Sequence, residues 1–255
     1  MDIERQYTNS QSSPELPQAT WRGRDILIIS AGALFILLVL GGLIAWSFSL
    51  DPTQLDRAPV ILSVLLTAVE GIALIGSVAI LGLRRRGLDW TAAGIHPVSR
   101  NWLVQSLVIA AVITPLSGFI AAAIQMALGQ PLENPQLEFL IPEGFNWFGF
   151  IGMLIMGGFV APFAEELFFR GVLYKWLRDH IGVWPGILLS SLLFGAMHGE
   201  ISVAGAAAVL GVILAWVYEK SRSLWPAVII HVVNNSVKIA LLYILVAAGS
   251  VIPGL

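Results

Sequence analysis

Long apolar stretches separated by short polar segments are the main pattern of this chain. Seven stretches approach the roughly 20 apolar residues that cross a bilayer: 26–48, 59–83, 102–128, 147–170, 183–198, 202–218 and 224–249. The fifth and sixth are short, so we expect them to be partly buried by protein or to span incompletely. The third is long and contains Pro115, which leaves room for another element. The pattern predicts an all-α, polytopic transmembrane helical bundle of about seven to eight spans.

Composition supports the same class. The chain of 255 residues is 57% hydrophobic and only 12% charged, whereas a soluble domain has about 25% charged residues. The first stretch is longer than the apolar region of a signal peptide, so we interpret it as a retained span. The sequence has no cysteine, which excludes disulfides, thiolate zinc sites and cysteine nucleophiles.

The basic residues predict the orientation in the membrane. If the N-terminus is cytoplasmic, eleven of the 14 Lys and Arg residues fall on that side, and only Arg57 lies in an opposite loop. The positive-inside rule then favours a cytoplasmic N-terminus, an outer C-terminus and seven crossings of the cell membrane. The basic residues form short clusters beside the spans, of which 84–86 is expected to anchor to anionic lipid. They show no nucleic-acid signature.

The polar segments suggest one membrane domain. Residues 1–24 are polar and predict a flexible cytoplasmic tail. Residues 25–255 form the expected transmembrane domain, with the candidate catalytic motifs in 147–245. Within the sixth stretch, small residues recur on one helical face, which would let another helix approach closely: Ala204, Ala208, Gly211 and Ala215.

Three charged residues lie inside the fourth apolar stretch. Each charge at bilayer depth costs about 2.5–3.5 kcal/mol or more. Glu166 and Arg170 are four residues apart, so they face each other on a helix and can form an ion pair. Glu165 points about 100° away and has no such partner. Pro162 predicts a bend just before the glutamates that could admit water.

Two later stretches carry further polar groups. His198 follows Phe194 by one turn, and His231 and Asn235 share one helical face. Measured from the expected cytoplasmic helix ends, Glu165, His198 and Asn235 lie at roughly 21, 22 and 16 Å, and His231 at roughly 10 Å. Each histidine alone is equally consistent with a satisfied core group or with a residue that hydrogen-bonds two helices together, but together these groups predict a shared site at comparable depth.

One free glutamate, two histidines and an asparagine suit hydrolysis of an amide. A desolvated carboxylate can act as general base for water, and a histidine can share that water. A second histidine and an amide can donate to an oxyanion. The same Glu165, His198 and His231 could instead bind a divalent metal such as zinc. The residues leave both mechanisms open, whereas the G-x-S-x-G and H-E-x-x-H motifs are absent, and no Asp lies in a predicted span.

These motifs resemble the CPBP family of intramembrane proteases, also called the Abi family, which includes CAAX prenyl proteases and bacteriocin-processing or immunity proteins. The family pattern is E-E-x-x-x-R, F-x-x-x-H and H-x-x-x-N, and the chain has EELFFR, FGAMH and HVVNN in that order. The resemblance covers roughly residues 145–245. It implies a helical fold with a cavity that opens toward the cytoplasm.

The resemblance also implies roles for the residues. Glu165 and His198 would activate water, His231 and Asn235 would stabilise the oxyanion, and Glu166 and Arg170, with Phe194, would support the site. Members have been described both as metalloproteases and as metal-free glutamate proteases. We favour the metal-free form without a cofactor, since Asn235 and a free Glu165 suit water activation directly.

The resulting expectation is an intramembrane endopeptidase that cleaves a membrane-associated or lipidated peptide, either a CAAX-type substrate, which would be prenylated, or a peptide precursor. One alternative is a proton- or cation-coupled transporter that uses Glu165, His198 and His231 together with Glu70, which the protease motifs leave unexplained. The chain shows no internal repeat of the kind many transporters carry. A second alternative is a non-catalytic immunity or scaffold protein.

Overall fold

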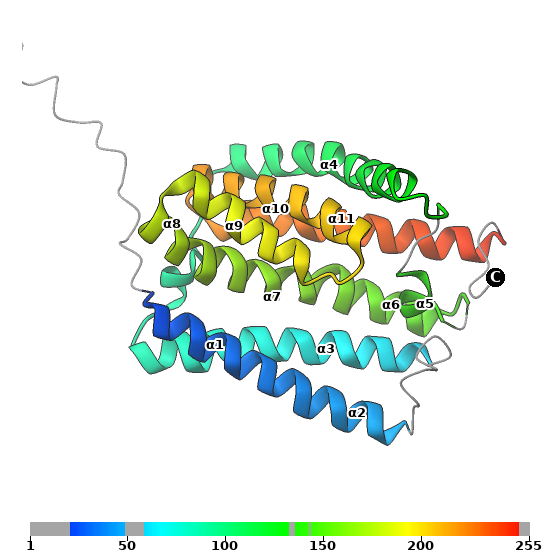
Figure 1. Cartoon of the computed structure of the whole chain (residues 1–255), viewed down its shortest axis with the longest axis horizontal. Helices are drawn as coiled ribbons and strands as arrows, with labels where there is room; N and C mark the ends of the chain where they lie inside the picture. The colour runs from blue at the N-terminus through cyan, green and yellow to red at the C-terminus, as the bar shows by residue number, and fades with distance from the viewer. Residues whose placement is uncertain (1–20, 49–58, 133–135, 143, 250–255) are drawn as a thin grey trace, which may run out of the picture.

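The computed structural model describes residues 21–48, 59–132, 136–142 and 144–249, which form helices and no strand. The helices run side by side as a bundle (Figure 1). Four of its rods are single helices: α4 (Arg100–Ala127), α9 (Val183–Ala196), α10 (Ile201–Ser221) and α11 (Leu224–Ala247). Two short helices lie between rods, η4 (Trp90–Ala93) and α5 (Leu137–Leu140).

The remaining rods are α-helices joined through π-helical turns. The first combines α1 (Gly23–Ile36), η1 (Leu37–Gly41) and α2 (Gly42–Ser47). The second combines α3 (Val60–Gly76) and η3 (Ser77–Arg84). The third is built from five segments, α6 (Trp147–Ile155), η5 (Met156–Val160), α7 (Ala161–Phe168), η6 (Phe169–Tyr174) and α8 (Lys175–Ile181). A π turn interrupts the regular α-helical ladder and is often found at functional positions.

The predicted polytopic bundle is confirmed. Within the described residues, six rods are long and apolar enough to cross a membrane, and α9 is a shorter apolar helix of 14 residues. The sixth stretch is longer than expected, because α10 extends over 21 residues, but it is partly buried by protein as expected, with half of its apolar window inside the bundle. The additional element considered for the third stretch is not found, since α4 continues through Pro115. Together these helices make the chain an integral membrane protein.

The fourth stretch was predicted to end at Arg170, but the helical rod continues to Ile181. Charged residues after Arg170 end the apolar pattern, but they find hydrogen-bond and ion-pair partners on neighbouring elements of the bundle. Lys175 donates to the carbonyl of Ala92 at 2.9 Å, and Glu219 accepts from the Tyr174 hydroxyl at 2.9 Å and pairs with Arg178 at 2.9 Å. The rod therefore ends in a polar but well-packed segment.

The start of α1 is fixed to the rest of the bundle. Trp21 is buried and its indole N–H donates to the carbonyl of Gly171 at 2.9 Å. Asp25 is fully buried and pairs with Arg85 and Arg86 beyond the end of η3. The helix begins at Gly23, inside the predicted tail of residues 1–24, and residues 1–20 of that tail lie outside the described residues.

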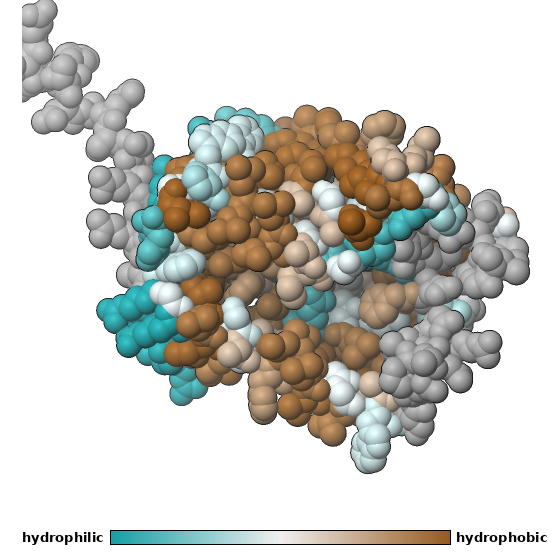
Figure 2. All heavy atoms as spheres, viewed as in Figure 1, coloured by the Kyte–Doolittle hydropathy of each residue, from teal (hydrophilic) through white to brown (hydrophobic). Residues whose placement is uncertain are grey.

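The small-residue face of α10 packs against α9, as predicted. A Cβ added at Gly195 would lie 2.4 Å from the carbonyl oxygen of Ala204 and 2.9 Å from Cβ of Ala208. A Cβ at Gly211 would lie 3.0 Å from Cβ of Ser191. Small residues thus bring the two backbones together. The face shown in Figure 2 is largely hydrophobic, as expected for a bundle surrounded by lipid, with hydrophilic residues gathered mainly at its left end and a smaller hydrophilic area near the middle.

Candidate active site

The two candidate glutamates lie on α7, between two π-helical turns. Pro162 in the first turn of α7 has no N–H and cannot donate to the carbonyl of Gly158. The hydroxyl of Ser236 on α11 donates to that carbonyl at 3.2 Å, and Asn235 Nδ2 donates to the carbonyl of Gly157 at 3.3 Å. The irregularity predicted at Pro162 is therefore a π turn, η5, tied to α11.

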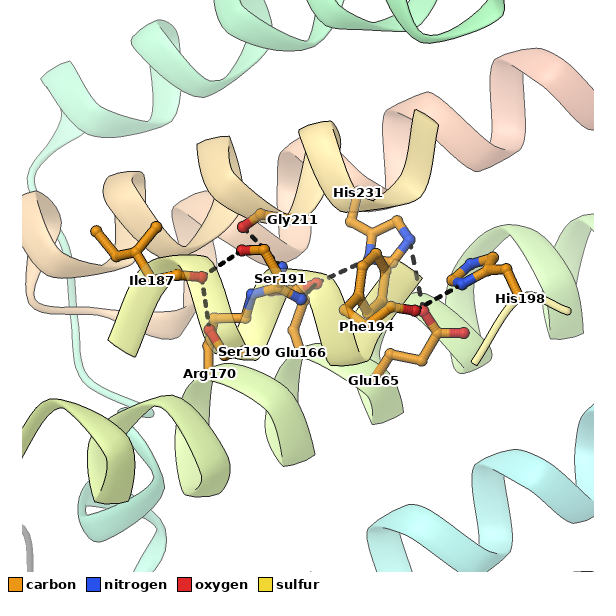
Figure 3. Close-up of polar contacts among 10 residues, drawn as sticks. All are labelled: Glu165, Glu166, Arg170, Ile187, Ser190, Ser191, Phe194, His198, Gly211 and His231. Carbon is orange, nitrogen blue, oxygen red and sulfur yellow. Dashed lines mark hydrogen bonds and ion pairs between the residues drawn. The ribbon is translucent and has the colours of Figure 1, made fainter. Parts of the chain in front are cut away.

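Glu166 is the centre of a buried polar network. Its side chain is fully buried, and its Oε1 accepts from Arg170 at 2.8 Å and from His231 Nδ1 at 2.9 Å (Figure 3). Arg170 also donates to the carbonyl of Gly211 on α10 at 2.9 Å. The predicted pair between Glu166 and Arg170 is confirmed. The additional bond to His231 joins α7 to α11.

Glu165 is the carboxylate that makes no hydrogen bond in this network. Its Oε2 lies 3.7 Å from Nε2 of His231, which is too long for a hydrogen bond. That oxygen is buried and has no hydrogen-bond partner among the described residues. The side chain as a whole is 13% exposed. Glu165 therefore has an acceptor atom shielded from bulk solvent and available to a small polar reactant.

The ring of Phe194 on α9 contacts Arg170 and both candidate histidines. Its fully buried ring lies 4.6 Å from Cζ of Arg170, in a cation–π contact. The rings of His198 and His231 meet it edge to face, with centroid distances of 4.9 and 5.5 Å. Phe194 thereby fixes the planes of the two imidazoles and covers the guanidinium.

His198 is held at a tight turn between α9 and α10. Its Nδ1 lies 2.9 Å from the carbonyl of Phe194, and because a carbonyl can only accept, Nδ1 carries the hydrogen and Nε2 is the free acceptor. Gly199 adopts a left-handed φ of 74° in the turn. Glu200 then caps α10 by accepting from the backbone of Ser202 and Val203; its pKa lies below the usual value, chiefly because of its hydrogen bond from the Ser202 hydroxyl.

Asn235 is oriented by its neighbour. Asn234 Nδ2 donates to Oδ1 of Asn235 at 2.9 Å, and Asn234 Oδ1 accepts from the hydroxyl of Ser117 on α4 at 3.1 Å. These bonds identify which end of the Asn235 amide is the donor. Of its two N–H groups, one is directed at Gly157 and the other is available to a ligand.

The structure brings most of the predicted residues into one contact network, which contains Glu165, Glu166, Arg170, Phe194, His198 and His231. Asn235 is linked to it through the backbone of η5. His231 was expected about 10 Å shallower than Glu165, yet it contacts both glutamates. The sequence connected Glu70 only with the transporter alternative; in the structure its helix, α3, packs against α7, which carries Glu165.

The zinc alternative required Glu165, His198 and His231 to surround one ion. Among the described residues, no group of three His, Cys, Asp or Glu side chains is arranged to hold a metal. Nδ1 of His198 is bonded to Phe194 and Nδ1 of His231 to Glu166, which leaves one nitrogen of each ring. The free Nε2 of each ring and the Glu165 carboxylate are suitable metal ligands by type, so metal dependence stays a prediction, and we derive no step through a metal.

Comparison with known proteins gives two matches. Residues 147–237 match the family model described as type II CAAX prenyl endopeptidase Rce1-like. A curated relative from Bacillus subtilis (strain 168), named "Putative membrane peptidase YdiL", is 22% identical over 135 residues, which are 53% of each chain. The matched region thus spans about half the length of that relative. No solved structure matches.

The family match begins at the first residue of α6 and ends within α11, so it contains both glutamates, both histidines and Asn235. These are the helices that the polar network joins. The resemblance to the CPBP family of membrane peptidases is therefore confirmed over residues 147–237, the part of the chain that matches the Rce1-like family model.

Proposed function

We propose that this chain is an intramembrane endopeptidase in which Glu165 activates water for attack on a peptide bond. One observation carries the proposal: of two adjacent buried glutamates, Glu166 is occupied by Arg170 and His231, whereas Glu165 faces His231 without a hydrogen bond. Glu166 has a structural explanation, and Glu165 lacks one. An intramembrane ionisable group without a structural partner indicates function.

The hydrolytic step follows from the positions of the acceptors. Glu165 removes a proton from water, and Nε2 of His198 accepts the second O–H and orients the oxygen. The oxygen adds to the carbonyl carbon of the substrate to form a tetrahedral oxyanion. The C–N bond then breaks as Glu165 returns its proton to the leaving nitrogen. Water is consumed, and a carboxylic acid and an amine are released; the second proton of water stays on the acid until the acid ionises.

Two donors are assigned to the oxyanion, Nε2 of His231 and the free N–H of Asn235 Nδ2. Because Nδ1 of His231 already donates to Glu166, donation from Nε2 requires the imidazolium form. In that form, the positive charge of Arg170 balances the negative charge of Glu166, and the positive charge of His231 balances the negative charge of Glu165. A fixed hydrogen-bond donor to the oxyanion raises kcat by a factor of about 10²–10³.

The proposed substrate is a membrane-associated or lipidated peptide. The matched family is described as prenyl endopeptidases, which favours a substrate with a prenylated C-terminal segment. The second candidate substrate is a peptide precursor that associates with the membrane. The site lies near the middle of its rod, 18 residues after Trp147 and 16 before Ile181 by position, so a substrate must reach it within the bilayer. We further propose that the protein resides in the cell membrane with a cytoplasmic N-terminus.

Glu165→Gln and His198→Ala test the proposal. Each variant should lose cleavage of peptides from a membrane extract by at least about 10²-fold, because one acceptor of water is gone. Glu165→Gln should insert and unfold like the parent, since Glu165 has no hydrogen bond to lose. His198→Ala also loses the bond to the carbonyl of Phe194, so its unfolding is measured beside its activity. The substrate is found by comparing peptides that accumulate in cells carrying Glu165→Gln with those in parent cells. Full activity of purified Glu165→Gln would reject this base.

A further inference from the structure

The carbonyl of Gly157 in η5 loses both of its usual helical partners. In a regular α-helix it would accept from the backbone N–H of Ala161, but that N–H donates to Met156 in the π turn. In a π-helical pattern it would accept from the residue five positions on, which is Pro162 and has no N–H. The carbonyl can therefore accept from another helix, and Asn235 Nδ2 on α11 donates to it at 3.3 Å.

This carbonyl sets the direction of a chain of hydrogen bonds, because a carbonyl can only accept. With Nδ2 of Asn235 directed at Gly157, its Oδ1 faces Asn234, whose Nδ2 donates to it at 2.9 Å. That leaves Asn234 Oδ1 as an acceptor, and the hydroxyl of Ser117 on α4 donates to it at 3.1 Å. These bonds form one chain, here called the amide relay, which runs from Ser117 on α4 to Gly157 on η5.

The two members of the relay behind Asn235 are buried. Ser117 is 1% exposed and Asn234 is 2% exposed, so water does not compete for their bonds, whereas Asn235 is partly exposed. The Ser117 hydroxyl also lies 2.9 Å from the carbonyl of Thr114. That carbonyl lies within the continuous helix α4 and has a backbone donor there, so the hydroxyl hydrogen is needed at Asn234.

A hydrogen bond that only joins two helices is complete with one polar side chain on each. Ser117 and Asn234 already satisfy that requirement between α4 and α11. The relay continues beyond it, since the amide of Asn234 also donates to Asn235, the residue assigned to the oxyanion. Its direction keeps Oδ1 of Asn235 occupied and turned away, so that only N–H groups of this amide remain to be donated.

We propose that Asn234 and Ser117 are positioning residues that hold the Asn235 amide with its second N–H available to the oxyanion. This inference rests on the proposed peptidase function. Without the donor of Asn234, the amide of Asn235 is held at one end only and can rotate away from the oxyanion. Ser117 lies outside the matched residues 147–237, so the relay adds α4, a helix that the family match does not contain, to the peptidase site.

The test uses the full chain in liposomes of neutral phospholipid and a library of fluorogenic apolar peptides, from which the peptide that the parent cleaves fastest is chosen. Asn234→Leu keeps a similar volume without a donor and should lower kcat by about 10²-fold, close to the loss in Asn235→Ala. Ser117→Ala should lower kcat by about tenfold, and Ser117→Thr, which keeps the hydroxyl, should retain most of it. KM should change little, since the relay lies behind Asn235.

A double-mutant cycle separates positioning from a structural role. When Asn235 is already alanine, Asn234→Leu should lower kcat by no more than about twofold, because the residue through which it acts is gone. Ser106→Ala is the matched control for Ser117→Ala: Ser106 is a buried serine on the same helix, and its hydroxyl bonds only to the carbonyl of Trp102 in that helix. This control should keep the kcat of the parent. Rates are normalised to the folded fraction, measured by gel filtration in detergent.

The outcomes distinguish the two proposals. No cleavage of any peptide by the parent rejects the proposed function, and the relay's role with it. Cleavage by the parent with an unchanged kcat in Asn234→Leu rejects the relay alone. Equal losses from Asn234→Leu with and without Asn235 also reject it, since that result assigns Asn234 to structure, and so does a loss in Ser106→Ala as large as that in Ser117→Ala.

Discussion

At the scale of single residues, the contrast between neighbouring glutamates carries the chemistry. Glu166 is bonded to Arg170 on its own rod and to His231 on α11, and Arg170 in turn reaches Gly211 on α10. Removal of the Glu166 charge would leave a buried guanidinium without its counter-ion. Glu165 belongs to the same helical turn but bonds to none of these groups. The same substitution should therefore act on different properties at the two positions.

We predict that Glu166→Gln lowers the free energy of unfolding by about 3–5 kcal/mol, because breaking a buried ion pair leaves an uncompensated charge. Glu165→Gln should change it by no more than about 0.5 kcal/mol. Thermal unfolding in detergent, followed by tryptophan fluorescence, measures both. Equal stabilities for the two variants would contradict the assignment of Glu166 as the structural glutamate.

Phe194 gives a second residue-scale prediction. Leucine at this position keeps the apolar volume but loses the cation–π contact with Arg170 and the edge contacts that fix His198 and His231. We expect Phe194→Leu to lower kcat by about 10²-fold, since small misplacements of catalytic groups have effects of that size. KM should change little. Unaltered kcat in a steady-state assay would show that Phe194 only fills space.

The sequence predicted the contact between Glu166 and Arg170 because the two residues are neighbours on any α-helix. It could not predict the bond from His231 to Glu166, which joins residues 65 positions apart. Nor could it place His231 at the depth of Glu165, since that estimate treated the helices as straight and equally tilted. Glu70 was visible as an unexplained charge, but the sequence could not predict that its helix, α3, packs against η5 and α7.

At the scale of elements, the π turns position the catalytic segment. Pro162 was predicted to disturb the helix, and it does so as η5, whose carbonyls bond to Asn235 and Ser236. The turn η6, by contrast, has no proline in Phe169–Tyr174, and its glycine, Gly171, packs closely against the carbonyl of Ala93, a contact that the sequence does not show. It follows Glu166 and contains Arg170, so tertiary contacts account for its place better than local propensity.

Pro162→Ala tests the role of η5. Alanine restores an N–H that can donate to Gly158 in a regular helix, in competition with Ser236. We expect stability to hold or rise, because proline is unfavourable by about 3 kcal/mol in a helix interior. Activity should fall by at least about tenfold, since Glu165 and Asn235 would shift relative to each other. Retained activity in the same peptide assay would mean that the turn does not position the base.

The close contact of α9 and α10 also belongs to this scale. In Gly195→Ala, the new Cβ would meet the carbonyl of Ala204 at 2.4 Å, and the helix that carries Phe194 toward His198 would have to move. Overpacking of this kind costs about 1–3 kcal/mol. Gly118→Ala on α4 is the matched control, because nothing lies within 4 Å of its added Cβ. Thermal unfolding should separate the variants; equal midpoints would contradict the tight interface.

At the scale of the whole molecule, orientation decides which compartment supplies the substrate. The charge pattern predicts that the ends of η3 and α10 and the start of α4 face the cytoplasm, whereas the end of α4 faces outward. Arg57, the basic residue expected in an outer loop, lies outside the described residues.

A chain without cysteine allows a direct measurement of orientation. Lys220 near the end of α10 and Gln130 just after α4 are both exposed, so each can be replaced by a single cysteine. A maleimide that cannot cross membranes should label Gln130→Cys on intact cells and Lys220→Cys only after permeabilisation. This pattern would place the ends of α8 and α10, joined through Arg178 and Glu219, on the cytoplasmic side. The reverse pattern would overturn the orientation and direct the search for substrates to peptides on the outer face.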